Sequence, residues 1–325
     1  METEKTTSWD IQTISDSGER VTHLNPDCVF YGHLSIYDFA KQFTNNGVVL
    51  DVGCGAGYGA AYLKAHGASL VYGIDYSEKA IAFDRFHFQD SGLEFRVMDA
   101  TNITDFPERS FDLIFTSNTL EHIPNVSAFL YKAWQLLKPS GTLLIAVPPI
   151  TNEHFEYHNV INPYHLNIWS PRQWHHTISQ YFAEITPYLH GLEKIGLGYQ
   201  PQHITGEHPL TPSSFIFEHG TIDMMYDTPT ITSIFVVHAP RPANAIPGPG
   251  AAITYIDSSY SRAVGEISPA VRQRLLRYFE PKEARISLIF KTIRMLRNQG
   301  IIATLKESFR YMKYHWILLK KHIAL

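Results

Sequence analysis

The stretch Leu50–Gly59, LDVGCGAGYG, decides the fold class of this 325-residue chain. It ends an apolar run and places four glycines within seven positions. A glycine-rich turn from a strand into a helix lets the backbone approach a nucleotide closely. Gly53, Gly55 and Gly57 give the spacing G-x-G-x-G. A dinucleotide site instead requires G-x-G-x-x-G, and Tyr58 stands where its last glycine would be. The spacing therefore disfavours a dinucleotide.

The chain around this stretch alternates short apolar runs with helical patterns. The apolar runs read as strands of a parallel sheet, because they are apolar on both faces. Such an alternation predicts a doubly wound, Rossmann-like α/β sheet covered by helices. We expect strands at about 47–53, 69–75, 93–100, 111–118 and 141–149, and helices at about 57–66, 77–89 and 126–137.

The part of the chain that follows differs in composition and in periodicity. Residues 150–170 are rich in His, Asn and aromatic residues without a clear period, which predicts a loop that forms a lid over a site. Ser170 and Pro171 then begin a helix that we expect to run to about Phe182. Residues 183–191 and 230–240 read as an antiparallel pair of strands that closes the sheet edge, with an insertion at 191–228.

These patterns divide the chain into four parts. We expect a polar segment at 1–26, a main domain at 27–240, a Pro/Gly linker at 241–252 and a helical extension at 253–325. Apolar residues at 302, 305, 309, 312, 316 and 319 form a helical stripe bordered by Lys and Arg. Such a helix can lie on an anionic membrane surface, pack against the core or a second subunit in a homodimer, or bind a partner protein.

The overall composition narrows the class of protein. Residues 281–325 hold ten Lys or Arg and two Glu, a charge of +8, so the rest of the chain carries −12 and the total is −4. That balance argues against a nucleic-acid partner. Two cysteines form no disulfide framework, and no window of about 18 uninterrupted apolar residues is present. The polar N-terminal residues lead us to expect no signal peptide. We therefore expect a cytoplasmic protein, which the extension can bring to the inner face of the membrane.

Three aspartates follow consecutive strands of the predicted sheet. Asp51 precedes the glycine turn, Asp75 ends the second strand and Asp99 ends the third. Asp75 lies 22 residues after Gly53, where a carboxylate can accept both hydroxyls of a ribose. Asp99 can accept from an adenine amino group while Met98 packs on the ring. Strand ends commonly carry turn-forming Asp, but three in consecutive units favour a cofactor site over that alternative.

At this point the sequence resembles the class I S-adenosylmethionine-dependent methyltransferases. The resemblance rests on VLDVGCGAGYG, GIDYS, VMDAT, FDLIFTSNTLEHIPN and LLKPSGTLLIAVP, over about residues 47–150. It implies S-adenosyl-L-methionine as cofactor and a seven-stranded sheet of order 3-2-1-4-5-7-6 with strand seven antiparallel. The cofactor residues that it implies are Asp51, Gly53, Gly55, Gly57, Asp75, Tyr76, Met98, Asp99, Ala100, Ser117 and Asn118.

The stretches GERVTHLNPDCVFYGHLSIYDFA and NPYHLNIWSPRQW are similar to methyltransferases of bacterial surface-polysaccharide and O-antigen type. This resemblance implies polysaccharide biosynthesis, with methylation of a sugar hydroxyl or of a phosphate that caps a glycan. A lipid or a small quinone-like aromatic is the alternative acceptor. An apolar pocket lined by Phe155, Tyr157, Tyr164 and Trp169 would favour that alternative, whereas a polar pocket of His and Asn would favour sugar. A non-catalytic binding module of the same fold is a second alternative.

A hydroxyl acceptor loses its proton as the methyl group arrives, so a general base helps, and imidazole suits neutral pH. His122 follows the fourth strand, where open α/β sheets place their ligands, and His165 lies in the lid segment. Each histidine can instead simply support its loop. Glu153, His154, Tyr157 and His158 match no strong metal-binding spacing, so we expect no metal.

Arg20 precedes the predicted core, in the region where such enzymes often fold a segment over the cofactor. It can pair with a carboxylate of the cofactor or with a substrate phosphate. Ordinary surface placement is the expectation.

Overall fold

The computed structural model describes residues 14, 20–24, 26–160, 162, 164–192, 210–228, 230–256 and 262–263. The chain divides into two compact units, residues 1–266 and 267–325. The basic amphipathic stripe at 302–319, with most of the predicted helical extension, lies outside the described residues. Everything below concerns the first unit.

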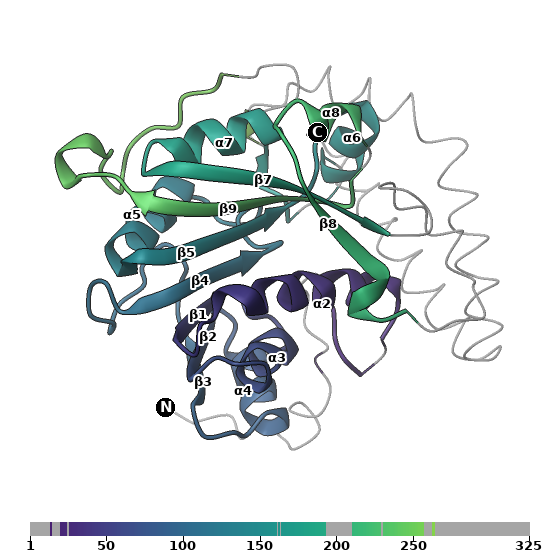
Figure 1. Cartoon of the computed structure of the whole chain (residues 1–325), viewed down its shortest axis with the longest axis vertical. Helices are drawn as coiled ribbons and strands as arrows, with labels where there is room; N and C mark the ends of the chain where they lie inside the picture. Colours follow the sequence, from purple (N-terminus) through teal and green to yellow (C-terminus); the bar gives the residue numbers. More distant parts are fainter. Residues whose placement is uncertain are drawn as a thin grey trace, which may run out of the picture. The chain divides into compact units, whose positions relative to one another are not determined.

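An eight-stranded sheet forms the centre of this unit (Figure 1). Strands β1, β2, β3, β4 and β5 are parallel, and β9 pairs antiparallel with both β5 and β7. The order across the sheet is β3-β2-β1-β4-β5-β9-β7-β8. The strands are β1 (Val48–Val52), β2 (Leu70–Asp75), β3 (Leu93–Val97), β4 (Phe111–Ser117), β5 (Leu137–Val147), β7 (Phe182–Leu192), β8 (Phe215–His219) and β9 (Thr232–Pro240).

The first seven positions of this order match the order that the sequence predicts, with β7 as strand six and β9 as the antiparallel strand seven. The predicted count of seven is wrong, because β8 adds an eighth strand. This strand falls inside the predicted insertion 191–228 and pairs antiparallel with Tyr188–Leu192. Five residues give little periodicity to detect, and only the tertiary pairing with the open edge of β7 makes them a strand.

Helices cover both faces of the sheet (Figure 1). One apolar cluster joins the sheet to α2, α3 and α4, and a second joins it to α5 and α7. Asp27, Ser77, Asn125 and Ser170 cap the starts of α2, α4, α5 and α7 through side-chain oxygens. The helices are α2 (Cys28–Ala40), α3 (Tyr58–Ala65), α4 (Glu78–His87), α5 (Val126–Leu136), α6 (Glu153–Val160), α7 (Pro171–Ser179) and α8 (Met224–Asp227).

The lid segment, residues 150–170, is more ordered than the sequence predicts. It contains α6 and the two-residue strand β6 (Asn167–Ile168), which pairs with β10 (Arg262–Ala263). Asn152 starts α6, because its side chain accepts from Phe155 N at 3.1 Å and its carbonyl accepts from Glu156 N at 3.0 Å. The expectation of a loop throughout is therefore wrong. The next predicted helix ends at Ser179 and not near Phe182.

The predicted Pro/Gly linker packs against the sheet domain. Ile246 contacts the cluster that includes α5 and α7, as do the following Ile253 and Tyr255. Trp134 Nε1 donates to the carbonyl of Arg241 at 2.8 Å, and Asn125 Nδ2 donates to that of Pro249 at 3.2 Å. This segment is thus held by the domain, and the compact unit continues to residue 266.

None of the helices formed by the described residues has the length and apolar character needed to cross a bilayer.

Candidate functional site

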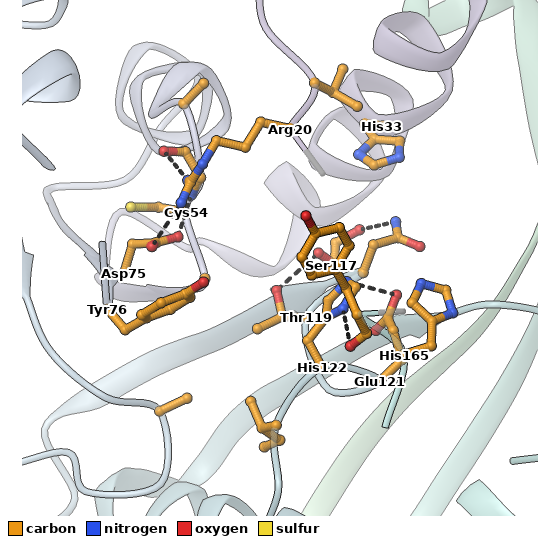
Figure 2. Close-up of a pocket in the computed structure, with 18 of the residues that line it drawn as sticks. Arg20, His33, Cys54, Asp75, Tyr76, Ser117, Thr119, Glu121, His122 and His165 are labelled. Carbon is orange, nitrogen blue, oxygen red and sulfur yellow. Dashed lines mark hydrogen bonds and ion pairs between the residues drawn. The ribbon is translucent and has the colours of Figure 1, made fainter. Parts of the chain in front are cut away.

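A cavity of about 950 Å³ opens at the carboxyl ends of β1, β2 and β4 (Figure 2). Ligands of open α/β sheets bind at this edge. Both predicted catalytic histidines, His122 and His165, line the cavity. So do nine of the eleven predicted cofactor residues, namely Gly53, Gly55, Asp75, Tyr76, Met98, Asp99, Ala100, Ser117 and Asn118.

The glycine turn forms one wall through its backbone. Gly53, Gly55 and Gly57 have φ angles of 76°, 61° and 67°, a region that favours glycine. The amides of Gly53 and Cys54 donate to the carbonyl of Ile74 at 2.8 and 3.0 Å, which ties the turn to β2. A Cβ atom on Gly53 would lie 2.3 Å from Thr119 Oγ1. The turn therefore packs directly against Thr119, and it can do so only because Gly53 carries no side chain.

Asp75 ends β2 beside this turn. Its carboxylate accepts from the amide of Gly55 at 3.1 Å and from that of Ser77 at 2.9 Å. These bonds hold the carboxylate at the cavity wall, with 8% of the residue exposed. Tyr76, directly after it, is 77% exposed at the cavity.

Arg20 reaches the same carboxylate from the N-terminal segment. Its guanidinium lies 3.6 Å from Asp75 Oδ1 and donates to the carbonyl of Gly55 at 3.3 Å. Its side chain is 10% exposed, so the expectation of ordinary surface placement is wrong. Arg20 and Asp75 are far apart in the sequence, so no local sequence pattern could predict that they pair.

Asp99 follows β3 in an exposed turn at the cavity. Its carboxylate accepts from the amide of Thr101 at 2.7 Å and from the Thr101 hydroxyl at 2.8 Å. Met98 and Ala100 flank it and are half-buried. Asp99 thus forms a local turn as well as facing the cavity, so the two interpretations of this residue are compatible.

Two predicted cofactor residues, Asp51 and Gly57, lie behind the wall. Asp51 is fully buried and accepts from the hydroxyl of Tyr37 at 3.2 Å, and burial raises the pKa of Asp51 to about 8. Gly57 begins α3, where a Cβ atom would lie 2.7 Å from Asp84 Cγ. Burial likewise raises the pKa of Asp84 to about 9. Asp51 and Gly57 therefore support the glycine turn from beneath.

The exit of β4 forms the floor of the cavity. Asn118 has a φ of 49° and donates from its side chain to Ser117 Oγ at 3.1 Å. Thr119 Oγ1 donates to the carbonyl of Ser117 at 3.1 Å. This tight turn directs the following Glu121 and His122 toward the cavity.

Glu121, His122 and His165 form a cluster across the cavity from Asp75 (Figure 2). One ligand atom of each lies within 4.8 Å of those of the other two. Glu121 and His165 are buried, whereas the side chain of His122 is 29% exposed. The two imidazole rings meet edge to face, with centroids 4.8 Å apart. The fold therefore brings together both histidines that the sequence singles out, and adds a carboxylate.

Polar side chains continue the cavity beyond this cluster. We call this part the acceptor side; its lining includes His33, His158, Asn159, Asn162 and Tyr164. Of the four aromatics that would favour an apolar acceptor, only Tyr164 lines the cavity among the residues whose side chains the structure describes. Trp169 is buried in the core, and the side chain of Tyr157 lies outside that description.

Sequence reasoning missed three contributors to the site. Glu121 carries a signal, because it directly precedes His122 in the quoted motif LEH. His33 comes from α2, and Thr119 packs under Gly53. The positions of these last two depend on tertiary contacts, which single-sequence spacing does not encode.

Comparisons with known proteins agree with the cofactor side of this cavity. Residues 50–145 match the profile of the family described as "Methyltransferase domain". The ubiquinone biosynthesis O-methyltransferase of Rhodopseudomonas palustris (strain HaA2) is 30% identical over 161 residues, 47% of this chain and 62% of that protein. Phosphoethanolamine N-methyltransferase 2 of Caenorhabditis elegans is 33% identical over 118 residues, 35% of this chain and 27% of that protein. The chain therefore spans less than two thirds of either relative.

A solved structure, the SAM-dependent methyltransferase from Archaeoglobus fulgidus, matches 63% of this chain and 93% of its own, with 16% identity and a TM-score of 0.47. The family match at residues 50–145 is to a methyltransferase domain, which implies S-adenosylmethionine as the methyl donor. The cavity fits that cofactor, because a Cβ on Gly55 would project into open space with only Gly53 O within 4 Å, and because carboxylates line the cavity at the ends of β2 and β3.

Proposed function

We propose that this chain is an O-methyltransferase that methylates a hydroxyl of a small polar acceptor, a sugar or glycan precursor. One observation carries the proposal: a cluster of Glu121, His122 and His165 faces the cofactor side across a single cavity. A methyl donor alone does not require such a cluster. An acceptor that must lose a proton does.

The domain's own residues would hold S-adenosylmethionine in distinct ways. The turn at Gly53 and Gly55 would receive the methionyl part, Asp75 would accept from the ribose hydroxyls, and Asp99 would accept from the adenine amino group. When bound, this cofactor supplies a methyl group on a positively charged sulfur, which is already activated for in-line displacement. The protein's remaining task is to hold the acceptor oxygen close and in line, and such positioning is worth several kcal/mol.

His122 and His165 are the candidate bases that take the proton from the acceptor hydroxyl. Their rings lie at the exit of β4 and in the lid segment, so they approach one region of the cavity from two elements. The buried carboxylate of Glu121 lies 3.9 Å from His122 Nε2. This arrangement suits removal of a proton from a neutral hydroxyl.

The acceptor side favours a hydroxyl-rich molecule over an apolar one. Polar side chains of His33, His158 and Asn162 line this part of the cavity. A few polar groups in a pocket fix the orientation of a ligand and favour one that can hydrogen-bond with them. This lining supports a sugar or glycan precursor.

A quinone-like aromatic is the second candidate acceptor. The similarity of 161 residues to a ubiquinone biosynthesis O-methyltransferase favours it. Tyr164 could stack against such a ring, since it is 40% exposed and lines the cavity. The two candidates differ in how many hydroxyls they present to the acceptor side.

The direct test is transfer of tritiated methyl groups from S-adenosylmethionine by the purified full chain. Nucleotide sugars and lipid-linked oligosaccharides form the first acceptor set, and catechol-type quinone precursors and phosphoethanolamine form the second and third. We expect label on a hydroxyl of the first set. Label confined to the second or third set would overturn the sugar assignment.

Variants then test the role of the histidines. His122→Ala and His165→Ala should each slow transfer at least tenfold while S-adenosylmethionine affinity stays within about twofold. His66→Ala is the matched control, because His66 is exposed at the end of α3, outside the cavity. Wild-type turnover in both cavity variants would remove the histidines from the mechanism.

A further inference from the structure

The cluster of Glu121, His122 and His165 combines two imidazoles and one carboxylate at the cavity wall. Two histidines and a glutamate, with the remaining positions left to water or substrate, are a known donor set of catalytic zinc sites. We infer that this cluster binds one divalent transition-metal ion of the zinc class. This departs from the sequence-based expectation of no metal, which considered other residues of the lid segment.

Hydrogen bonds fix which nitrogen of each ring can bind a metal. His122 Nδ1 lies 3.0 Å from the backbone carbonyl of Tyr164, which can only accept, so Nδ1 carries the proton. His165 Nδ1 lies 2.6 Å from Asn159 Oδ1. Asn159 Nδ2 donates to the carbonyl of Phe155 at 2.7 Å, and this bond orients the amide so that its oxygen faces His165. In each neutral ring the lone pair is therefore on Nε2.

This pattern is how proteins prepare histidines for a metal. A ligating imidazole nearly always donates its other N–H to a carbonyl or carboxylate, which fixes the tautomer and the ring orientation. Here a backbone carbonyl and an oriented amide perform that role for the two rings. A pair of general bases would need only one ring so prepared.

The spacing needs only a small contraction. His122 Nε2 and Glu121 Oε1 are 3.9 Å apart, and all three ligand atoms lie within 4.8 Å of one another. Two ligands of a tetrahedral zinc ion lie about 3.3 Å apart, given bonds of about 2.0–2.1 Å. Side-chain torsions can supply the difference. Imidazole ligands also favour zinc-class ions over Mg²⁺, which prefers oxygen.

Such an ion would change how the acceptor is activated, a step that rests on the proposed function. The acceptor oxygen would bind at an open position, where the ion lowers the pKa of its O–H group and the proton passes to solvent. The oxygen's electron pair then forms the bond to the methyl carbon as the carbon–sulfur bond breaks, with that electron pair staying on sulfur. The two histidines would act through the ion and not as bases themselves.

The test is metal binding by the full chain after chelator treatment, without S-adenosylmethionine. Calorimetric titration with Zn²⁺ and the visible spectrum with Co²⁺ should both report one site per chain. Asn159→Ala should weaken Zn²⁺ binding by about 10- to 100-fold, the range for a residue that orients a ligating histidine. Glu121→Gln and His165→Ala should weaken it more, and His66→Ala should not change it.

S-adenosylmethionine affinity, measured on the same preparations, shows that each variant is folded. Absence of Zn²⁺ binding, or binding that Glu121→Gln and His165→Ala leave unchanged, would overturn the metal site whatever the enzyme's activity. Methyl transfer that persists after chelation would overturn the metal's role while leaving the proposed function intact. A variant-sensitive metal site in a chain that methylates no hydroxyl would overturn the proposed function alone.

Discussion

The cofactor side and the acceptor side of the cavity are formed by different kinds of chemical groups. The cofactor side is mainly backbone and strand ends between Gly53 and Ala100, held by bonds such as Gly55 N to Asp75 at 3.1 Å. The acceptor side uses side chains from α2, from the exit of β4 and from the lid segment, such as His33 and His158. The first is local in sequence, whereas the second exists only in the fold.

This difference separates what each side can change. Backbone geometry at a glycine turn tolerates almost no substitution, because the space and the φ angle both exclude side chains. Side chains on a helix or lid segment can be exchanged one at a time without disturbing the sheet. The fold therefore fixes the methyl donor and leaves the acceptor to be set by the acceptor side.

The largest expected effect comes from a substitution in the glycine turn, which forms the backbone part of the cofactor side. Gly53→Ala should weaken S-adenosylmethionine binding about 100-fold, because alanine at a φ of 76° costs about 1–2 kcal/mol and its Cβ would lie 2.3 Å from Thr119 Oγ1. Calorimetric titration measures this. Gly248→Ala is the matched control, since a Cβ there meets nothing within 4 Å. Equal affinities in the two variants would contradict the account of the turn.

The next effect concerns the buried acids behind the turn. Burial raises the pKa of Asp51 to about 8 and that of Asp84 to about 9, well above the ordinary aspartate value of about 3.9. The folded chain thus keeps protons on these two carboxyls that the unfolded chain releases, so their contribution to stability is present at low pH and falls as pH rises toward 8–9. We expect this contribution to the free energy of unfolding to fall by about 1 kcal/mol or more between pH 5 and pH 8, the equivalent of one pKa unit.

Urea unfolding at the two pH values checks this dependence. Asp51→Asn should flatten it, because asparagine fills the site without a charge. Asp90→Asn, at an exposed position after α4, should leave it as in the wild type. A pH dependence that is the same in Asp51→Asn as in the wild type would show that Asp51 is already ionised in the folded chain.

The smallest effect separates stability from cofactor binding on the same side. Ser77→Ala removes the side-chain cap of α4, whose Oγ accepts from Ala80 N at 3.2 Å, and should cost about 1 kcal/mol of stability. The bond from the Ser77 amide to Asp75 does not need that side chain. S-adenosylmethionine affinity should therefore stay within about twofold, and a tenfold loss would mean that the cap itself shapes the cofactor side.

The same contrast explains which parts of the fold could be predicted from the sequence alone. The parallel strands, the glycine turn and the strand-end acids were predictable, because periodicity and spacing are local. Strand β8 was not, since its five residues depend on pairing with the edge of β7. Helix α6 was missed because its residues lack an amphipathic period, although Asn152 is a recognisable start signal.

The candidate site divides along the same line. Asp75 and Asp99 were identified by position after a strand, and both line the cavity. The placing of Asp51 beneath the turn was not visible, because a strand residue next to a glycine turn can face either way. Glu121 can be recognised as a site residue only in the fold, because its neighbour in the cluster, His165, lies 44 residues later in the sequence.

The most direct measurement is calorimetric titration of S-adenosylmethionine into the wild-type chain and into Asp75→Ala, with Asp90→Ala as the control. We expect one site per chain in the wild type and in the control, and at least tenfold weaker binding in Asp75→Ala. No binding by the wild type, or the same affinity in Asp75→Ala, would contradict the claim that this cavity holds the methyl donor.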